Sequence, residues 1–202
     1  MRYVFHTLDV FTRQIFGGNP LAVLPDARGL SATRMQAIAR EFNLSETVFV
    51  LPAEHPAHTR RLRIFTPAAE LPFAGHPTLG TAWLLATLGA VPLQEPATPL
   101  VFEEGVGPVA VEIAVENGQP TFARLTAARC PERGPAPPEP AQLAELLSLT
   151  VVDLAGGDWQ PEAWSCGVPF LCVPLRDRTA LARARLRQDR WEATLADCWA
   201  PQ

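Results

Sequence analysis

The sequence has no block of basic residues and no long apolar run, and both absences exclude classes of function. Its 202 residues carry 17 Lys and Arg against 21 Asp and Glu, which gives a net charge of −4 at pH 7. A chain without a basic patch lacks the electrostatic footprint of a nucleic-acid or anionic-membrane binder. No stretch reaches the roughly 20 apolar residues of a membrane span, and the first residues, MRYVFHTLDV, lack the apolar core of a signal peptide. We therefore expect no nucleic-acid partner, no membrane partner and a cytoplasmic location.

Cysteine is sparse, and its spacing predicts neither a zinc site nor a disulfide framework. The four cysteines form no Cys-x-x-Cys pair. We expect a reducing compartment with free, mostly buried thiols. The hydrophobic fraction of 48% and the charged fraction of 19% are typical of a globular chain. The length suits one large domain or two small ones. The cysteines are Cys130, Cys166, Cys172 and Cys198.

The stretch ELPFAGHPTLGTAWLLATLGA, residues 70–90, joins a polar turn to a run that has no polar stripe. Pro77 suits the first position of a helix and Gly89 the residue just past its end, so the pattern predicts a helix over Pro77–Leu88. A helix that is apolar on every side is a buried one. We therefore predict a central helix wrapped by other elements. The Gly75-His76 turn lies at its N-terminus, where free N–H groups and the helix dipole favour an anion such as a carboxylate.

Strands and short helices flank this helix in the sequence. Met35, Ile38, Ala39 and Phe42 recur at helical spacing, with Ser31 as the expected N-cap and Asn43 as the end. Asn117-Gly118 is a hairpin signal between two strands. A short helix is expected over Ala141–Leu147, and one or two polar helices rich in arginine are expected over Thr179–Ala196. The predicted strands are Arg2–Phe11, Leu21–Leu24, Glu46–Leu51, Arg60–Thr66, Leu100–Phe102, Val109–Val115, Thr121–Leu125 and Phe170–Val173.

The proline-rich stretch Arg129–Pro140 interrupts these elements and indicates a linker. The two halves of the chain have a similar order of strands and short helices. We divide the chain into an N-terminal lobe, residues 1–118, which holds the central helix, and a partial C-terminal lobe, residues 119–202.

Glu46 is the first candidate for chemistry. It stands at the junction between the end of a helix and an apolar strand, within Asn43-Leu44-Ser45-Glu46-Thr47. A carboxylate at such a junction can be partly desolvated, which raises its pKa towards the range where it takes and gives protons near neutral pH. The alternative is an ordinary solvated glutamate at the start of a strand.

His76 is the second candidate. It would point into the same cleft as the N-terminus of the central helix, where it could bind a substrate carboxylate or assist proton transfer. Gly75 then lets a ligand approach the backbone closely. The alternative is a histidine that makes only local hydrogen bonds in a turn.

Three further patterns are weak. Glu54, His55 and His58 could be drawn as a metal cluster, but they lie in a loop without a further ligand nearby, and we expect no metal site. Gly17-Gly18 is not followed by the Lys-Ser/Thr of a phosphate loop. Cys166 has no histidine near it in the sequence, so a structural thiol is the better interpretation than a nucleophile.

Three long motifs resemble the phenazine-biosynthesis PhzF-like family. They are DVFTRQIFGGNPLAVLPDA at residues 9–27, AREFNLSETVFV at 39–50 and RIFTPAAELPFAGHPTLGTAWLL at 63–85, and they cover roughly the first 90 residues in the family's order. The segment SCGVPFL at residues 165–171 resembles the family more loosely. The resemblance implies an α+β fold like that of diaminopimelate epimerase, with two pseudo-symmetric lobes, each a curled, mostly antiparallel sheet around a central helix, and a second lobe that is incomplete here.

The resemblance also implies roles for single residues. Glu46 matches the family's catalytic glutamate, which moves a proton between carbons of a small carboxylated substrate without a metal or organic cofactor. Gly75 and His76 match the substrate-binding turn, and Ser45 and Asn19 are expected beside the site. Related epimerases use two cysteines as acid and base. The corresponding position of the first lobe is Ala74, within FAGH at residues 73–76, which argues against two-thiol chemistry.

One departure from the family opens a second hypothesis. Members carry an Asp-Pro-Ala-Thr-Gly-Ser-like segment in the second lobe, and no such segment is found in the 202 residues. The resemblance implies an isomerase. The missing segment raises the alternative, a catalytically impaired, shortened homologue that acts as a binding or assembly protein. An incomplete second lobe would leave sheet edges and apolar faces uncovered, which favours a homodimer.

Overall fold

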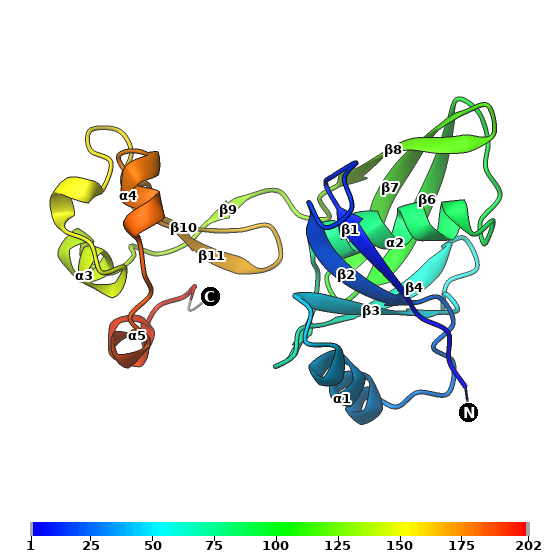
Figure 1. The fold of residues 1–202 in the computed structure, drawn as a ribbon, viewed down its shortest axis with the longest axis horizontal. Coiled ribbons are helices and arrows are strands. Elements are labelled where there is room, and N and C mark those ends of the chain that lie inside the picture. The colour runs from blue at the N-terminus through cyan, green and yellow to red at the C-terminus, as the bar shows by residue number, and fades with distance from the viewer. Residues whose placement is uncertain (1, 201–202) are drawn as a thin grey trace. The chain divides into compact units, whose positions relative to one another are not determined.

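The computed structural model describes residues 2–200, and the chain divides into two compact units, Met1–Ala128 and Arg129–Gln202 (Figure 1). The second unit begins at the proline-rich stretch. This corrects the boundary predicted after residue 118, because strand β8 (Gln119–Thr126) pairs along its length with β7 (Gly107–Glu116). A division after residue 118 would separate the two strands of one hairpin. Both turn residues, Asn117 and Gly118, have a positive φ, at 52° and 71°, as this type of hairpin turn requires.

The first unit is built on one eight-stranded sheet with the order β1-β2-β3-β4-β6-β7-β8, and β5 pairs with β4 off this path. Five of its strand pairs are antiparallel, and two, β2 with β3 and β4 with β6, are parallel. The predicted α+β class with a mostly antiparallel sheet is confirmed. The remaining strands are β1 (His6–Val10), β2 (Asn19–Leu24), β3 (Glu46–Leu51), β4 (Arg60–Phe65), β5 (Glu70–Leu71) and β6 (Ala97–Glu104).

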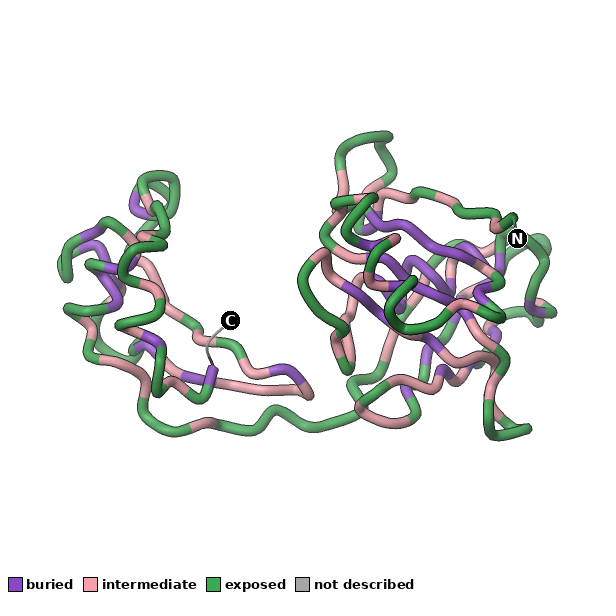
Figure 2. Tube along the Cα trace, turned by 90° about the horizontal axis from the view of Figure 1, so that it is seen from below, coloured by how far each residue is buried: buried purple, intermediate pink, exposed green. Residues whose placement is uncertain are grey.

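The sheet curls around helix α2 (Gly75–Thr87), which lies inside its curve (Figure 1). The inner face of the sheet and α2 share one core, which includes Val48, Leu85 and Phe102. Figure 2 shows these buried stretches gathered in the interior of the unit. The central helix was predicted to begin at Pro77, but it begins two residues earlier, with Ala74 as its N-cap. Proline remains acceptable there because the first N–H groups of a helix have no partner within it.

Helix α1 (Ala32–Phe42) covers the outer face of β2, β3 and β4. Ser31 caps it and accepts a hydrogen bond from the amide of Arg34, and Asn43 ends it in the left-handed conformation. Both ends are as predicted. Met35 and Ala39 are fully buried in the outer core with Phe49 of β3. The inner face of the sheet is therefore covered by α2, and α1 covers the outer face over β2, β3 and β4, whereas most outward residues of β7 are exposed.

The second unit holds a small antiparallel sheet, β11-β10-β9, and short helices. Its elements are β9 (Glu132–Arg133), α3 (Pro140–Leu146), a 3-10 helix (Val151–Asp153), β10 (Glu162–Ser165), β11 (Pro169–Cys172), α4 (Arg178–Arg183) and α5 (Gln188–Leu195). None of the helices described in either unit is long and apolar enough to cross a membrane.

The cysteines correct a prediction. All four are free, but Cys130 and Cys172 are exposed, and Cys166 and Cys198 are only half-buried. Cys172 lies in the edge strand of a sheet too small to have two covered faces. The expectation of mostly buried thiols is therefore wrong.

Candidate active site

The alternation of side chains along β3 decides where Glu46 points. Val48 and Val50 belong to the inner core against α2, whereas Phe49 belongs to the outer core against α1. Glu46 has the same parity as Val48, so its carboxylate starts the inner row of the strand. The inward-facing side chains of β3 lie along α2, and Glu46 is the one nearest the N-terminus of this helix. Glu46 and His76 therefore meet although they are 30 positions apart.

Glu46 and His76 contact each other at this end of the sheet. The Nε2 atom of His76 lies 3.2 Å from Oε2 of Glu46, and the two side chains are only 10% and 17% exposed. The approach does not have the geometry of a hydrogen bond, and both atoms are buried without a hydrogen-bond partner among residues 2–200. Buried polar atoms are nearly always bonded, so two unbonded ones facing each other mark a place where a ligand group can bind.

Asn19 approaches the other nitrogen of the same ring. It is the first residue of β2, and its Nδ2 atom lies 3.3 Å from Nδ1 of His76. When the amide donates to Nδ1, the ring hydrogen is on Nε2, the atom that faces Glu46. Three predicted residues, Asn19, Glu46 and His76, therefore form one polar chain, although they lie in three elements.

Burial shifts the pKa values of the acid and the base in opposite directions. It raises the pKa of the Glu46 carboxyl above its usual 4.5. It lowers the pKa of the His76 imidazole below 6.5, and the backbone carbonyl of Pro20 opposes this shift more weakly. Both shifts favour the uncharged forms. A carboxyl group whose pKa is raised towards neutrality can both accept and return a proton, as general acid–base catalysis requires.

The N-terminus of α2 offers free backbone donors beside this pair. Ala74 provides no side-chain cap, so the first N–H groups of the 13-residue helix have no such partner. Gly75 is the first helical residue, and a Cβ atom added to it would lie 3.8 Å from Leu125, an ordinary contact. The packing of the chain therefore does not require glycine at this position, which leaves the approach of a ligand as a reason for it.

Residues next to the pair are more exposed than the pair itself. Ser45 is exposed next to Glu46, and its hydroxyl has no hydrogen-bond partner in the described chain. The ring of Phe11 lies 6.5 Å from that of His76, centroid to centroid, although Phe11 is 74% exposed. A surface cavity of about 620 Å³ is lined in part by Pro20 and Leu44, the neighbours of Asn19 and Ser45. Nothing in the sequence pattern identified Phe11, because an exposed aromatic residue in a turn has no distinguishing local signal.

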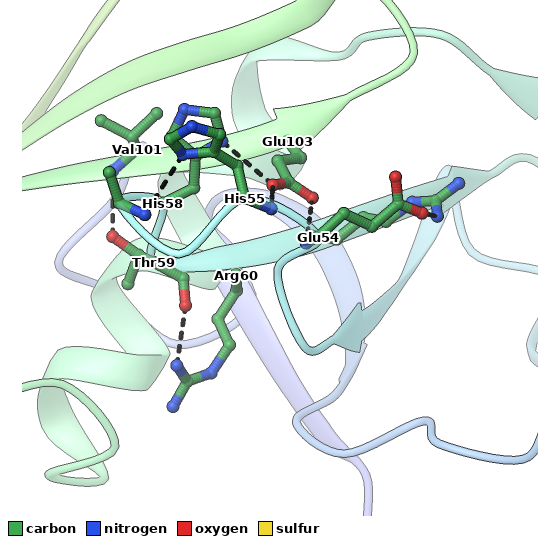
Figure 3. Close-up of polar contacts among 9 residues, drawn as sticks. Glu54, His55, His58, Thr59, Arg60, Val101 and Glu103 are labelled. Atoms are coloured by element: carbon green, nitrogen blue, oxygen red, sulfur yellow. Dashed lines mark hydrogen bonds and ion pairs between the residues drawn. The ribbon is translucent and has the colours of Figure 1, made fainter.

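The loop with Glu54, His55 and His58 has a structural arrangement instead of a metal-binding one (Figure 3). The carboxylate of Glu103 accepts hydrogen bonds from the amides of Glu54 and His55, at 2.8 and 2.7 Å, and lies 3.0 Å from Nδ1 of His58. Glu54 itself pairs with Arg61. Among the described residues no group of three or more His, Cys, Asp or Glu side chains could hold a metal ion.

Known proteins resemble this chain in sequence over most of its length. The sequence profile of the family described as phenazine biosynthesis-like protein (PhzC-PhzF) matches residues 8–201. An uncharacterized isomerase of Mesorhizobium japonicum is 43% identical over 91% of this chain and 59% of its own length. The trans-2,3-dihydro-3-hydroxyanthranilate isomerase of Pseudomonas aeruginosa is 36% identical over 90% of this chain and 59% of its own length.

A solved structure has the same fold. A predicted epimerase from Pseudomonas aeruginosa superposes with a TM-score of 0.84 at 36% identity, over 98% of this chain and 68% of that one. The expected diaminopimelate epimerase-like fold is thereby confirmed. This chain spans 59% of the length of the two relatives named above.

Proposed function

Because the chain belongs to the phenazine biosynthesis-like protein (PhzC-PhzF) family, we propose that it is an isomerase that moves a proton between carbons of a small carboxylated metabolite. The observation that carries this proposal is the contact between Glu46 and His76, at 3.2 Å, without a hydrogen bond between them. Proton transfer to and from carbon requires a partly buried carboxyl group whose oxygen is not already hydrogen-bonded to the protein.

Glu46 carries the proton in this mechanism. As a carboxylate it accepts a proton from one carbon of the substrate, and as a carboxylic acid it returns that proton to another carbon. The double bond of the substrate shifts between the two events, so that atoms and charges balance and no redox partner is needed. Burial raises the pKa of Glu46, which makes its carboxylate a stronger base than an ordinary glutamate.

The N-terminus of α2 holds the substrate carboxylate in the proposed complex. The uncapped N–H groups of the first turn donate to the anion, and Nε2 of neutral His76 adds a donor from the side. Ser45 and Asn19 border the bound molecule, and Gly75 allows it to approach the backbone. The relative from Pseudomonas aeruginosa is named for trans-2,3-dihydro-3-hydroxyanthranilate, a carboxylated ring, and a substrate of this class suits these donors.

Exchange of carbon-bound hydrogen in deuterated water tests the proposal. The variant Glu46→Gln keeps the shape of the side chain and removes the proton carrier, so incorporation of deuterium into the carboxylated ring should fall by at least about 100-fold. Glu41→Gln, an exposed carboxyl of α1, is the matched control and should exchange as the parent does. Equal rates in the parent and the Glu46 variant would refute the mechanism.

A non-catalytic binding or assembly role is the second candidate, and one observation favours it. The loop beside His76 exposes three large apolar side chains, Phe11, Ile15 and Phe16, the last of them 93% exposed. Exposed apolar clusters of this kind mark interaction sites. A protein of this second type would bind small carboxylates without exchanging their protons, whereas the proposed enzyme does both.

The same loop makes a homodimer our proposal for the oligomeric state. Light scattering after size exclusion should give the mass of two chains for the parent. Phe16→Ser should shift the mass towards one chain if the loop forms the interface.

A further inference from the structure

A second carboxyl group lies on the inner face of the sheet, and the mechanism above does not use it. Glu104 ends β6, and it has the same parity as Leu100 and Phe102, which belong to the inner core. Its Oε1 atom lies 2.6 Å from Oγ1 of Thr78, the fourth residue of α2. Its Oε2 atom is buried and has no hydrogen-bond partner in the described part of the chain.

Thr78 links this carboxyl to the residue that begins α2. The hydroxyl of Thr78 lies 2.8 Å from the backbone carbonyl oxygen of Ala74, and its amide donates to the same carbonyl at 3.3 Å. Ala74 is the N-cap, immediately before Gly75 and His76. The chain of contacts therefore runs from the end of β6 to the turn that presents the candidate substrate-binding groups.

The turn that follows Glu104 holds the same segment from the other side. The amide of Val106 donates to the carbonyl of Pro72 at 3.1 Å. A Cβ atom added to Gly105 would lie 2.8 Å from Cα of Pro72, so only glycine allows this approach. The β6–β7 turn thus contacts Pro72, in the chain before α2, and Glu104 contacts Thr78, inside α2.

The hydrogens available to these groups satisfy both contacts of the Thr78 hydroxyl only if Glu104 is a donor. The Thr78 hydroxyl has one hydrogen but lies within bonding distance of two oxygens, the carboxyl of Glu104 and the carbonyl of Ala74. A carbonyl cannot donate. Both contacts are hydrogen bonds only when Glu104 carries a proton and donates to Thr78, and Thr78 in turn donates to Ala74.

We propose that protonated Glu104 is a positioning residue of the site: through Thr78 it fixes the first turn of α2, which carries Gly75 and His76. When Glu104 loses its proton, the Thr78 hydroxyl turns to the carboxylate and the Ala74 carbonyl loses one of its two donors. The turn then becomes less well held. The consequence for turnover rests on the proposed function, whereas the positioning itself does not.

The environment of Glu104 favours the protonated form. Burial raises the pKa of its carboxyl from 4.5 to about 7, and the hydrogen bond from Thr78 lowers it by less. The dipole of α2 favours an anion at this end of the helix, an effect opposite in direction to that of burial. A surface cavity of about 740 Å³ reaches Glu104, so protons can be exchanged with solvent there.

The charged groups around that cavity are engaged with one another. In α2, His76 faces Glu46 instead of Glu104. The imidazole of His55 accepts a hydrogen bond from the amide of Ala57. The ion pairs lining the cavity are Arg61 with Glu54 and Arg63 with Glu70, and the His58 ring lies 3.0 Å from the carboxylate of Glu103.

Nuclear magnetic resonance of the full 202-residue chain, with carbon-13 in the glutamate carboxyls, tests the proposal. The signal missing from Glu104→Gln belongs to Glu104 and should titrate with a midpoint near pH 7, instead of the usual 4.5. The protection of the Thr78 amide against hydrogen exchange should fall about fivefold across that midpoint, as expected for one lost hydrogen bond. A midpoint near 4.5, or a midpoint near 7 without change at Thr78, would overturn the proposal.

Three variants separate positioning from general damage to the fold. Glu104→Gln cannot ionise but still donates to Thr78, so the amide should stay protected on both sides of pH 7. Thr78→Val removes both hydroxyl bonds and should lose protection at every pH, and Thr78→Ser should restore it. If Thr78→Val protects the amide as well as the parent does, the link through the hydroxyl is wrong.

Turnover gives a separate reading. If the proposed function holds, the kcat for deuterium exchange by the parent should fall as the pH rises above the midpoint of Glu104. The Glu104→Gln variant should not show this fall. If no chain exchanges substrate protons, the proposed function fails, while the titration of Glu104 and the Thr78 protection still decide the positioning role.

Discussion

Two pairs of histidine and glutamate in the first unit have similar distances and similar exposure, but they differ in hydrogen bonding and in the direction of the glutamate pKa shift. His58 and Glu103 are 3.0 Å apart, and His76 and Glu46 are 3.2 Å apart. The carboxylate of Glu103 also accepts two backbone amides, and its pKa falls to about 2. The carboxyl of Glu46 has a buried oxygen without a partner, and its pKa rises.

The two faces of the curled sheet account for the difference. Glu46 and Glu104 point inward, toward the core around α2, and burial raises the pKa of both. Glu103 follows the opposite parity, points outward, and meets the amides of the 54–55 turn (Figure 3). Adjacent residues of one strand therefore have pKa values near 2 and near 7.

The comparison shows that proximity of an acid and a base does not identify a chemical site. A carboxylate bonded to backbone amides fixes a loop, and its low basicity makes it a poor proton carrier. A carboxyl that is buried and incompletely bonded remains available to a ligand. The two kinds are distinguished by their hydrogen bonding, because the side chains of Glu103 and Glu46 are 16% and 17% exposed. Only the folded chain displays this bonding.

The largest expected difference between the pairs is in catalysis. His76→Asn removes the ring that faces Glu46 and should lower the rate of substrate deuterium exchange by about 100-fold, within the range found for positioned acid–base groups. His58→Asn is the matched change in the other pair and should leave the rate per folded molecule unchanged. A comparable loss in both variants would mean that the two pairs do not differ as argued.

The second difference is in the pH dependence of stability. The pKa of Glu103 is about 2 in the folded protein against 4.5 in the unfolded chain, so the unfolded state binds more protons between these values. The stabilisation from Glu103 is therefore complete above pH 4.5 and is lost as the pH falls towards 2.

Denaturant unfolding at several pH values measures this effect. Glu103→Gln should be less stable than the parent near neutrality, and the difference should shrink steadily below pH 4.5. For Glu104 the sign is reversed, because its pKa is raised to about 7. Its contribution is fully present below pH 4.5 and is lost as the pH rises towards 7, a loss that Glu104→Gln should remove. A pH-independent difference at Glu103 would contradict the assignment.

Local signals predicted much of the first unit. The strand Glu46–Leu51 was predicted with its observed bounds, because a run of β-branched and aromatic residues follows a helix stop. Ser31, Asn43 and the Asn117-Gly118 turn were also predicted, since capping and turn formation depend on one or two side chains.

What the sequence could not predict depends on contacts between distant residues. The helix begins at Gly75, two residues before the Pro77 at which the proline rule placed its start. Glu103 and Glu104 are the same residue type at adjacent positions, so the sequence does not distinguish them. Only the orientation of the strand shows that Glu103 holds the 54–55 turn and that Glu104 is buried. Asn19 and His76 were expected near one site through resemblance, while the ring contact that joins them spans 57 positions.

The smallest expected effect is that of adding a methyl group at Gly75, in the first turn of α2. Gly75 has ordinary space for a Cβ atom and needs no left-handed conformation, so Gly75→Ala should leave the free energy of unfolding unchanged or raise it by up to about 0.5 kcal/mol, as helix propensity favours alanine. A ligand carboxylate close to the Gly75 amide would meet the new methyl group, so binding of the carboxylated ring should weaken several-fold in calorimetry. Gly80 is the contrasting position, because a Cβ atom there would lie 2.6 Å from Leu21 and should destabilise the protein. If Gly75→Ala binds the ring as the parent does, the ligand does not approach the first turn of α2, and the carboxylate must be held elsewhere.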